Sequence, residues 1–197
     1  MKKIIFITVM TLSTFCFGQL TKFSIEASYP LPTGNNFIGK NYNGVADLGI
    51  KYRIQNLVIA NIGFSLDGSL LQTSQSGYSI SIDDYYSYKV NAVVIEPRIY
   101  AELNMKKITR FHPSVGLGYS FLLFNVTSAT PNIDSSTFKK TQSGVNVNLG
   151  LAFDFTKNIY LHTQYDYIVL TNTDSNAPKT TYNTNVNFLK FGIGVRL

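Results

Sequence analysis

The sequence predicts an antiparallel, up-and-down transmembrane β-barrel, most simply one of eight strands. Three observations predict it: apolar and polar residues alternate along most of the chain, many of the alternating segments reach ten residues or more, and short and long connections take turns between them. Alternation with a period of two is typical of a strand with two different faces. A tilted strand needs ~9–11 residues to cross a bilayer, whereas a globular strand usually has ~5–6.

The N-terminus has the pattern of a cleavable signal peptide over residues 1–18. A short positive start is followed by an apolar stretch over 4–17, and Cys16 and Gly18 are small residues that suit a cleavage site after Gly18. The stretch is shorter than the ~20 residues of a membrane-spanning helix, which makes an uncleaved anchor the weaker alternative. We therefore expect one domain over residues 19–197.

Composition excludes several classes of function. The formal net charge is +6, and no basic run is longer than two lysines, so nothing resembles a nucleic-acid-binding surface. Apolar runs after the leader stop at about four residues, too short for a transmembrane helix. The only cysteine, Cys16, lies in the leader, so the mature domain is expected to form no disulfide and no zinc–thiolate site.

The clearest strand covers residues 145–155, where every odd position is apolar and every even position is small or polar. Seven other segments follow the same rule less strictly. They cover residues 22–29, 47–53, 58–67, 93–103, 111–123, 159–169 and 189–197.

The connections alternate in length, which indicates a barrel of the bacterial outer membrane with its short turns in the periplasm. The short ones cover 54–56, 104–108 and 156–158, and the long ones 30–43, 68–86, 125–143 and 172–184. Alternation continues through the second long connection around Asp83-Asp84, which predicts that the third and fourth strands protrude as a hairpin. The long connections are the expected contact surface for a ligand outside the cell.

The polar face is expected to line the interior, because it is rich in small residues and carries charges of both signs. Seven acids oppose seven bases there if Lys22, Lys89 and Arg196 are included, and buried charges need partners. A narrow barrel of eight strands is just filled by side chains. The predicted interior network consists of Glu26, Asp47, Lys51, Arg53, Asp67, Glu96, Arg98, Glu102, Asp154, His162, Asp166 and Lys190.

The C-terminus carries a resemblance to a known family. Gly192, Val195 and Leu197 fit a glycine followed by hydrophobic residues that alternate to the end, although Leu197 replaces the usual terminal aromatic. With the strand pattern over 20–197, the chain resembles the small outer-membrane β-barrels typified by OmpX and the membrane domain of OmpA. The resemblance implies outer-membrane lipids and the barrel-assembly machinery as partners, in a Gram-negative bacterium.

Three alternatives to a non-enzymatic surface protein stay open at this point. Some barrels of this size modify lipid A, and His112 and Ser114 have the same-face spacing of a His–Ser pair, although they are expected inside the barrel near the periplasm. A small pore is opposed by the filled interior. A soluble lipocalin-like barrel would turn the apolar face inward. The sequence suggests no cofactor and no metal cluster, so we favour a structural or adhesive protein that is not an enzyme.

Overall fold

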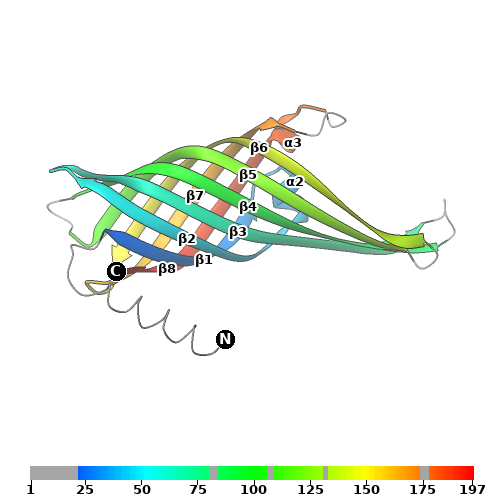
Figure 1. The fold of residues 1–197 in the computed structure, drawn as a ribbon, viewed down its shortest axis with the longest axis horizontal. Helices are drawn as coiled ribbons and strands as arrows, with labels where there is room; N and C mark the ends of the chain where they lie inside the picture. Colours follow the sequence, from blue (N-terminus) through cyan, green and yellow to red (C-terminus); the bar gives the residue numbers. More distant parts are fainter. Residues whose placement is uncertain (1–21, 80–83, 106–108, 131–132, 174–177) are drawn as a thin grey trace, which may run out of the picture.

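The computed structural model describes residues 22–79, 84–105, 109–130, 133–173 and 178–197, and the side chains of all of these except 78–79, 84–86, 128–130 and 133–138. The predicted signal peptide and its cleavage site lie outside the described residues. Eight antiparallel strands form one closed barrel in sequence order (Figure 1). They are β1 (Phe23–Thr33), β2 (Asn43–Asn56), β3 (Ala60–Ser79), β4 (Asp84–Leu103), β5 (Phe111–Thr130), β6 (Ile133–Asp154), β7 (Ile159–Asn172) and β8 (Asn185–Arg196).

Pairing between the first and last strands closes the barrel. β1 and β8 pair from Ser24 opposite Arg196 to Thr33 opposite Asn187. The backbone N–H of Leu197 extends this seam by donating to the carbonyl of Phe23 over 2.9 Å. In the barrel proper, each strand therefore has a hydrogen-bonded neighbour on both sides. Among the described residues, no helix is long and apolar enough to cross a membrane.

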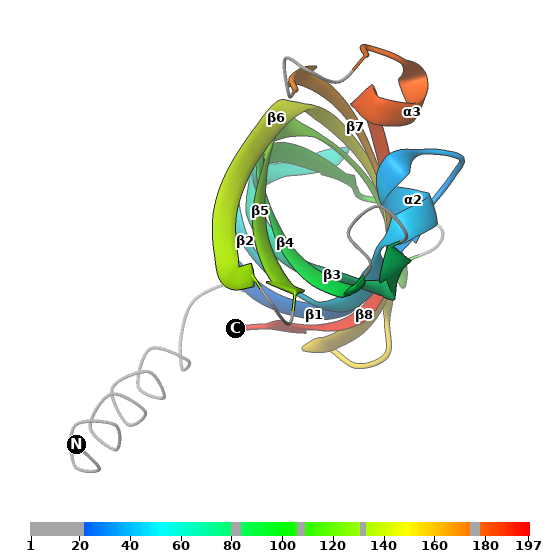
Figure 2. The same cartoon turned by 90° about the vertical axis from the view of Figure 1, so that its right-hand side faces the viewer.

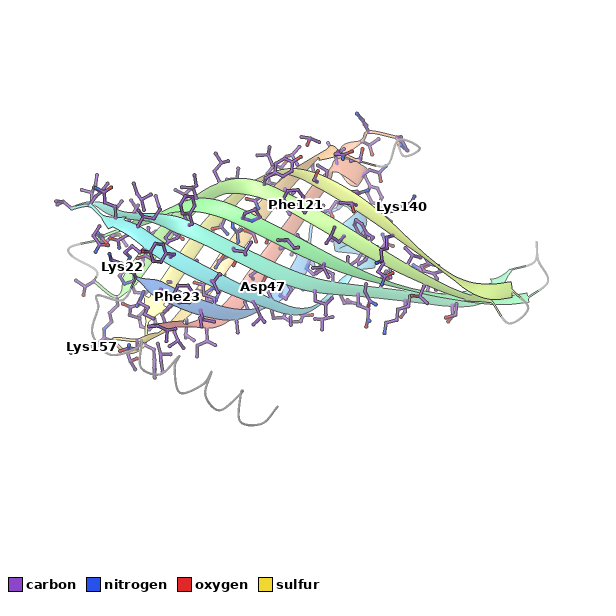
Figure 3. The ribbon with its side chains drawn as sticks, viewed as in Figure 1. Lys22, Phe23, Asp47, Phe121, Lys140 and Lys157 are labelled. Carbon is purple, nitrogen blue, oxygen red and sulfur yellow. The ribbon has the colours of Figure 1, made fainter. Side chains whose placement is uncertain are left out.

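The strands turn their apolar side chains outward, as the alternation predicts. In β6, Leu149 is 57% exposed whereas its neighbour Asn148 is 6% exposed. The exposed large hydrophobic side chains come from every strand, and Figure 3 shows side chains projecting all around the wall. A soluble lipocalin-like barrel would show the opposite arrangement, with its apolar side chains inside.

The two ends of the barrel differ strongly. The turn end carries the C-terminus, the start of β1 and the turns β2–β3 and β6–β7, with Lys22 and Lys157 near it (Figure 3). At the hairpin end, the hairpins β3–β4 and β5–β6 extend far past the other strands (Figure 1). Two short helices, α2 (Phe37–Asn41) and α3 (Thr181–Thr184), lie on one side of that mouth (Figure 2).

Two of the predicted long loops consist of strand in the structure. The connection 68–86 consists almost entirely of strand, because β3 runs to Ser79 and β4 starts at Asp84, which confirms the protruding hairpin. The connection 125–143 is also strand apart from the undescribed residues 131–132, a second hairpin that was not predicted. The connections 30–43 and 172–184 carry α2 and α3, and the turn predicted at 54–56 lies at 57–59.

We expect charge on the outer wall to be costly where a bilayer would cover it. Leu149→Arg should lower the free energy of unfolding in lipid vesicles by ~2–4 kcal/mol, because arginine on the lipid face near the midplane is poorly solvated. Val58→Arg is the control, since Val58 is 76% exposed in the turn after β2 and should lose only ~0–1 kcal/mol. Urea titration measures both, and equal losses would contradict this placement in the membrane.

Candidate functional site

The barrel interior has two parts with different chemistry. Toward the turn end, the inward side chains are polar and charged. Toward the hairpin end they are apolar, and form one buried cluster with residues from α2 and its C-cap. Both parts are built by the same alternation of strand residues, so the difference comes from the residue types at the inward positions.

The centre of the polar part is a cluster of two cations and four carboxylates. Lys190 Nζ lies 2.6 Å from Glu96 Oε2, 2.9 Å from Asp47 Oδ2 and 3.0 Å from Asp166 Oδ2. Arg98 bridges the cluster, with Nη1 at 2.5 Å from Asp166 Oδ1 and Nη2 bonded to Asp67. All six side chains are almost completely buried. Each cation is therefore held by at least two strands besides its own.

Neutral side chains complete the hydrogen bonding of these carboxylates. Ser28 and Ser69 donate to Asp47 over 2.6 and 2.5 Å, and Asn148 donates to Asp166 over 2.5 Å. Buried carboxylates are tolerated only where their lone pairs have such partners. The small polar residues on the inward face are thus part of the charge network rather than mere filler.

A second group surrounds Glu26, closer to the turn end. Lys51 Nζ lies 2.7 Å from Glu26 Oε1, the Tyr160 hydroxyl donates to the same oxygen over 2.7 Å, and Gln164 donates to Oε2 over 2.9 Å. His162 Nδ1 lies 3.2 Å from Gln164 Nε2. Gly194 makes room for this group, since a Cβ at that position would overlap the Tyr160 ring.

The third group closes the turn end of the interior. Arg196 Nη1 lies 2.6 Å from Asp154 Oδ1, and His112 Nε2 lies 2.9 Å from Asp154 Oδ2. Arg53 Nη2 lies 3.3 Å from Glu102 Oε1. The Arg196 guanidinium also stacks over the Tyr160 ring at 4.4 Å, which connects this group to the one above it.

All twelve residues of the predicted network point into the barrel, but they do not form one cluster. The structure distributes them over the three groups, with His162 beside Gln164. The expected balance of seven acids and seven bases is wrong, because Lys22 and Lys89 are exposed. Lys89 points outward since the next residue, Val90, points inward on β4. His112 and Tyr160 join the network although the predicted set did not include them.

The structure gives little support to the His–Ser pair as a catalytic unit. His112 and Ser114 share the inward face, but the described contacts of His112 go to Asp154 and, at 4.0 Å, to Glu102. The Ser114 hydroxyl instead lies beside Gly150, where an added Cβ would overlap it. Both residues lie near the turn end of the interior. Among the described residues, no group of three or more His, Cys, Asp or Glu side chains is arranged to hold a metal ion.

The apolar part of the interior is the feature that the sequence analysis missed. Six of its members are completely buried: Leu71, Ala92, Val94, Leu122, Ile168 and Phe188. The sequence does indicate this cluster, at the positions where the alternation of apolar and polar residues fails. Short runs such as 121–124 and 168–170 are apolar on both faces, because one face meets the surroundings of the barrel and the other meets this cluster.

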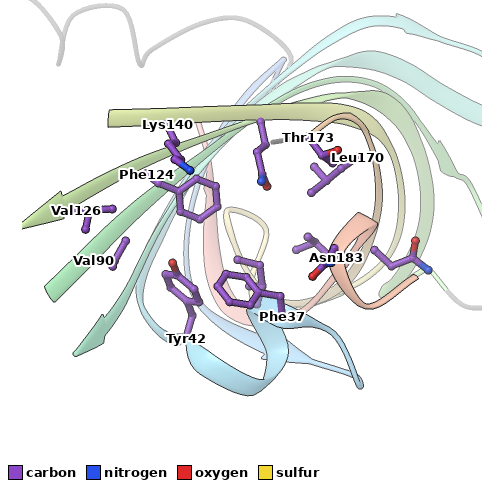
Figure 4. Close-up of a pocket in the computed structure, with 13 residues that line it drawn as sticks. Phe37, Tyr42, Val90, Phe124, Val126, Lys140, Leu170, Thr173 and Asn183 are labelled. Carbon is purple, nitrogen blue, oxygen red and sulfur yellow. The ribbon is translucent and has the colours of Figure 1, made fainter. Parts of the chain in front are cut away.

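A cavity of about 330 Å³ opens from this cluster into the mouth (Figure 4). Its apolar lining includes Phe124, Val90 and Leu170 from the wall and Ile38 from α2. Tyr42 packs edge-on against Phe124, with ring centroids 6.0 Å apart. Burial raises the pKa of Tyr42 to about 12, with a smaller effect from Tyr88, so its hydroxyl stays protonated at neutral pH.

The helix α2 is fixed in the mouth by its cap. The Asn36 side chain accepts from the backbone N–H of Gly39 over 2.8 Å and donates to the carbonyl of Thr33 over 2.8 Å. This ties the first turn of α2 to the end of β1 and directs Ile38, which is 3% exposed, into the barrel. One wall of the cavity is thus anchored to the strands.

Comparison with known proteins settles the family. Residues 7–196 match the model of the outer membrane protein β-barrel domain. The chain belongs to this family. It is an outer-membrane protein, so its turn end is periplasmic and its hairpin end extracellular, and the soluble alternative is excluded.

Individual relatives are distant. An uncharacterized protein of Coxiella burnetii (strain RSA 493 / Nine Mile phase I) is 27% identical over 195 residues, which cover 88% of this chain and 75% of the relative. A major outer membrane protein from Thermus thermophilus superimposes with a TM-score of 0.65 at 12% identity, covering 89% of this chain and 98% of that one. Neisserial surface protein A gives a TM-score of 0.56 at 15% identity, covering 89% and 96%. These structures share the fold.

We expect the central cluster to depend strongly on its lysine. Lys190→Met removes the cation beside three buried carboxylates and should lower the free energy of unfolding by ~3–5 kcal/mol in lipid vesicles. Lys157→Met, at the exposed turn between β6 and β7, should change it by less than ~0.5 kcal/mol. Urea titration followed by circular dichroism measures both. A Lys190 variant as stable as the Lys157 variant would contradict the structural role of the cluster.

Proposed function

We propose that the protein is a non-enzymatic surface protein that binds an extended polypeptide segment of a partner along the free edge of its extracellular sheet. The observation that carries this proposal is the continuation of β3–β6 beyond the barrel. In the barrel every strand has two neighbours, and in this extension two strands have only one.

The extension is a four-stranded sheet. β3 pairs with β4 as far as Ser79 opposite Asp84, and β4 pairs with β5 as far as Ser87 opposite Ala129. β2, however, accompanies β3 only to Asn43 opposite Gln72, and β7 reaches only Ser143 of β6. Over residues 73–79, the described structure has no strand on the outer side of β3. Such an edge presents backbone donors and acceptors to an incoming strand.

The edge of β3 fits this role better than the edge of β6. Residues 73–79 contain no charged residue and no proline, whereas 133–142 contain Asp134, Lys139 and Lys140. Proteins commonly use lysine and proline to keep an edge strand from pairing. The neutral edge of β3 lacks this protection, which is what a surface that pairs with another chain requires.

The interior supports a role without catalysis or steady transport. Its charged side chains pair with one another across the lumen, and Lys190, Leu122 and Phe188 are completely buried. A His–Ser pair at the periplasmic end also lies far from the outer leaflet, where lipid A is found. The long hairpins therefore remain as the part of the molecule best placed to act outside the cell.

The C-terminal strand supports a second partner, the barrel-assembly machinery. Val195 and Leu197 point outward at the end of β8, while Gly192 lies inward. A Cβ on Gly192 would overlap the carbonyl of Ala27 and approach His162, so this glycine is needed in the closed barrel as well. The alternating outer row is the part that an assembly factor would meet.

Panning a phage-displayed library of random dodecapeptides tests the edge. Wild-type protein in nanodiscs should enrich peptides with alternating β-branched residues, and Ser76→Lys should reduce their binding at least fivefold by placing a charge on the edge. Ser87→Lys is the matched control, because Ser87 lies directly opposite Ser76 on the inner strand β4. Peptides that bind wild type and both variants equally, or no enrichment at all, would contradict the proposal.

Single-channel recording in planar bilayers tests the closed interior. We expect no stable conductance from purified wild-type protein, because the three ion-paired groups and the apolar cluster occupy the lumen in series. Wider barrels are needed for an aqueous channel. Long-lived openings of constant size would favour a pore instead.

A further inference from the structure

We propose that the free edge of β3 pairs with the same edge of a second copy of this chain in a facing membrane, so that the protein joins two cells. This inference rests on the proposed function, because it names the partner that the edge binds. Three features carry it: the direction of β3, the symmetry of its edge and the distribution of charge along the extracellular sheet.

The direction of β3 separates the two ways in which copies could meet through this edge. β3 starts beside the periplasmic turn at 57–59 and runs outward to Ser79. Two copies in one membrane both run outward, so their β3 edges could only lie parallel. Two copies in facing membranes run in opposite directions, so these edges lie antiparallel, which is the slightly more stable pairing. The edge therefore favours a copy in another membrane.

The edge is compatible with its own reversed copy. An antiparallel pair of identical strands has a two-fold axis, so the central residue meets itself and every other residue meets its symmetry mate. Centred on Ser76, the segment 73–79 pairs Thr73 with Ser79, Ser74 with Tyr78, and Gln75 with Gly77. Like charges directly opposite each other destabilise a strand pair, whereas hydroxyl side chains stabilise it by hydrogen bonds. This uncharged, serine-rich segment therefore suits self-pairing.

The edge is held in a strand conformation before any partner binds. The β3–β4 ladder continues to Ser79 opposite Asp84, and the Tyr88 hydroxyl donates to Gln75 Oε1 over 2.6 Å. The side chains of Ser74, Gln75 and Ser76 are exposed. The helices α2 and α3 lie nearer the barrel than the hairpin tips (Figure 1). An incoming strand thus meets an ordered edge, which lowers the entropic cost of pairing.

Charge along the extracellular sheet also fits an antiparallel copy. Asp84 and Asp134 lie at the tip ends of β4 and β6, and Lys89 and Lys139 lie five residues closer to the barrel on the same strands. Five residues span ~16 Å of strand, too far for an ion pair between them. An antiparallel copy places the acidic tip of each sheet beside the basic base of the other, which favours this orientation on encounter.

The complementarity belongs to the two ends of the sheet and does not require any lysine to lack a partner. In the paired sheet, β4 of one copy lies three strand spacings from β4 of the other, or ~14 Å. At that separation the charges orient the approach of the two copies. The contact itself is made by the backbone and the neutral side chains of β3.

The β6 edge of a second copy is a poorer partner for β3. It would be antiparallel to β3 within one membrane, but it carries Asp134, Lys139 and Lys140, and charged residues keep an edge from pairing. Contacts between two different edges also repeat without closing and build open chains. Pairing of β3 with β3 instead closes as a dimer and covers both free β3 edges.

One pair of edges is a small contact, because each copy contributes the short segment 73–79. Many copies in two facing membranes bind together, and their combined strength exceeds that of one pair by the effect of multivalency. We therefore expect single molecules in detergent and adhesion between membranes that hold many copies.

Clustering of vesicles tests the partner. Protein purified from outer membranes is reconstituted at high density into phosphatidylcholine vesicles of two colours, and clusters containing both colours are counted. Wild-type vesicles should cluster, and Ser76→Lys or Ser76→Asp vesicles should cluster at least fivefold less, because a charge on the two-fold axis meets itself. Mixing the Lys vesicles with the Asp vesicles should restore clustering to within about twofold of wild type. Wild-type vesicles that stay separate, or a mixture that is not restored, would overturn the proposal.

Ser87→Lys and Ser87→Asp are the matched controls, because Ser87 lies directly opposite Ser76 on the inner strand β4. Vesicles with either control should cluster like wild type. The heat-dependent gel shift of each variant confirms that its barrel has folded. Clustering that Ser76→Lys and Ser87→Lys reduce equally would overturn the β3 edge as the contact.

A disulfide tests the two-fold axis and the facing membranes together. Cys16, in the predicted leader, is the only cysteine of the chain. Ser76→Cys places two thiols across the axis, where opposed residues are close enough for a disulfide. Vesicles with two different affinity tags are mixed and oxidised with copper–phenanthroline. We expect dimers that carry both tags, and none from Ser87→Cys. Dimers that never carry both tags would place the contact within one membrane and overturn the proposal.

The outcomes distinguish this inference from the proposed function. Peptides that bind wild type but not Ser76→Lys, together with wild-type vesicles that do not cluster, would leave the edge as a binding site and overturn a second copy as its partner. Failure of both peptide binding and clustering would overturn both. Clustering with restoration by the Lys and Asp mixture would support both.

Discussion

The pairing of β1 with β8 is the constraint on which the rest of the structure depends. A bilayer core offers no water to backbone N–H and C=O groups, so a sheet can cross it only when its two edges meet. The seam between Ser24 and Arg196 at one end and Thr33 and Asn187 at the other satisfies this condition. Closure then divides every strand between a lipid face and an interior face, and this division explains why the amino-acid pattern has a period of two.

Closure also determines what the interior must contain. In a barrel this narrow, an inward side chain meets side chains from the opposite wall, so each charge there needs a partner on another strand. Lys190 of β8 reaches carboxylates on β2, β4 and β7, and Arg98 of β4 reaches β3 and β7. Three of these five contacts, from β8 to β2, from β8 to β4 and from β4 to β7, connect strands that are not neighbours in the barrel. A buried ion pair is weak evidence for a gain in stability. These pairs do make any change of strand register costly, because a shift by one residue would move a cation to the lipid face.

The sequence predicted the strands and their inward faces correctly where the two faces of a strand differ in polarity. It was misleading where both faces are alike. Val145–Phe155 alternates without a break, and the strand, its outward face and its polar inward partners were all predictable. Near the mouth, Leu122 and Phe124 face inward while Phe121 and Leu123 face outward, so the period is lost and the apolar interior could not be separated from the lipid face. The hairpin over 125–143 was missed for a related reason: its polar residues resemble those of a loop. The grouping of the charges depends on register, which composition does not reveal.

Unequal strand lengths give the protein both its free strand edge and its apolar cavity. β1 has 11 residues, which is about what a bilayer crossing needs, whereas β3, β4 and β5 have 20 and β6 has 22. The additional residues of β3–β6 extend beyond the membrane as a sheet, and the edge of its outer strand is unpaired. The same inequality lowers the rim on the side of β7, β8, β1 and β2, where α2 and α3 replace the missing wall and leave the apolar cavity between themselves and the long strands. A barrel with eight equal strands would have neither feature, so both depend on the residues that prolong β3–β6 beyond the bilayer.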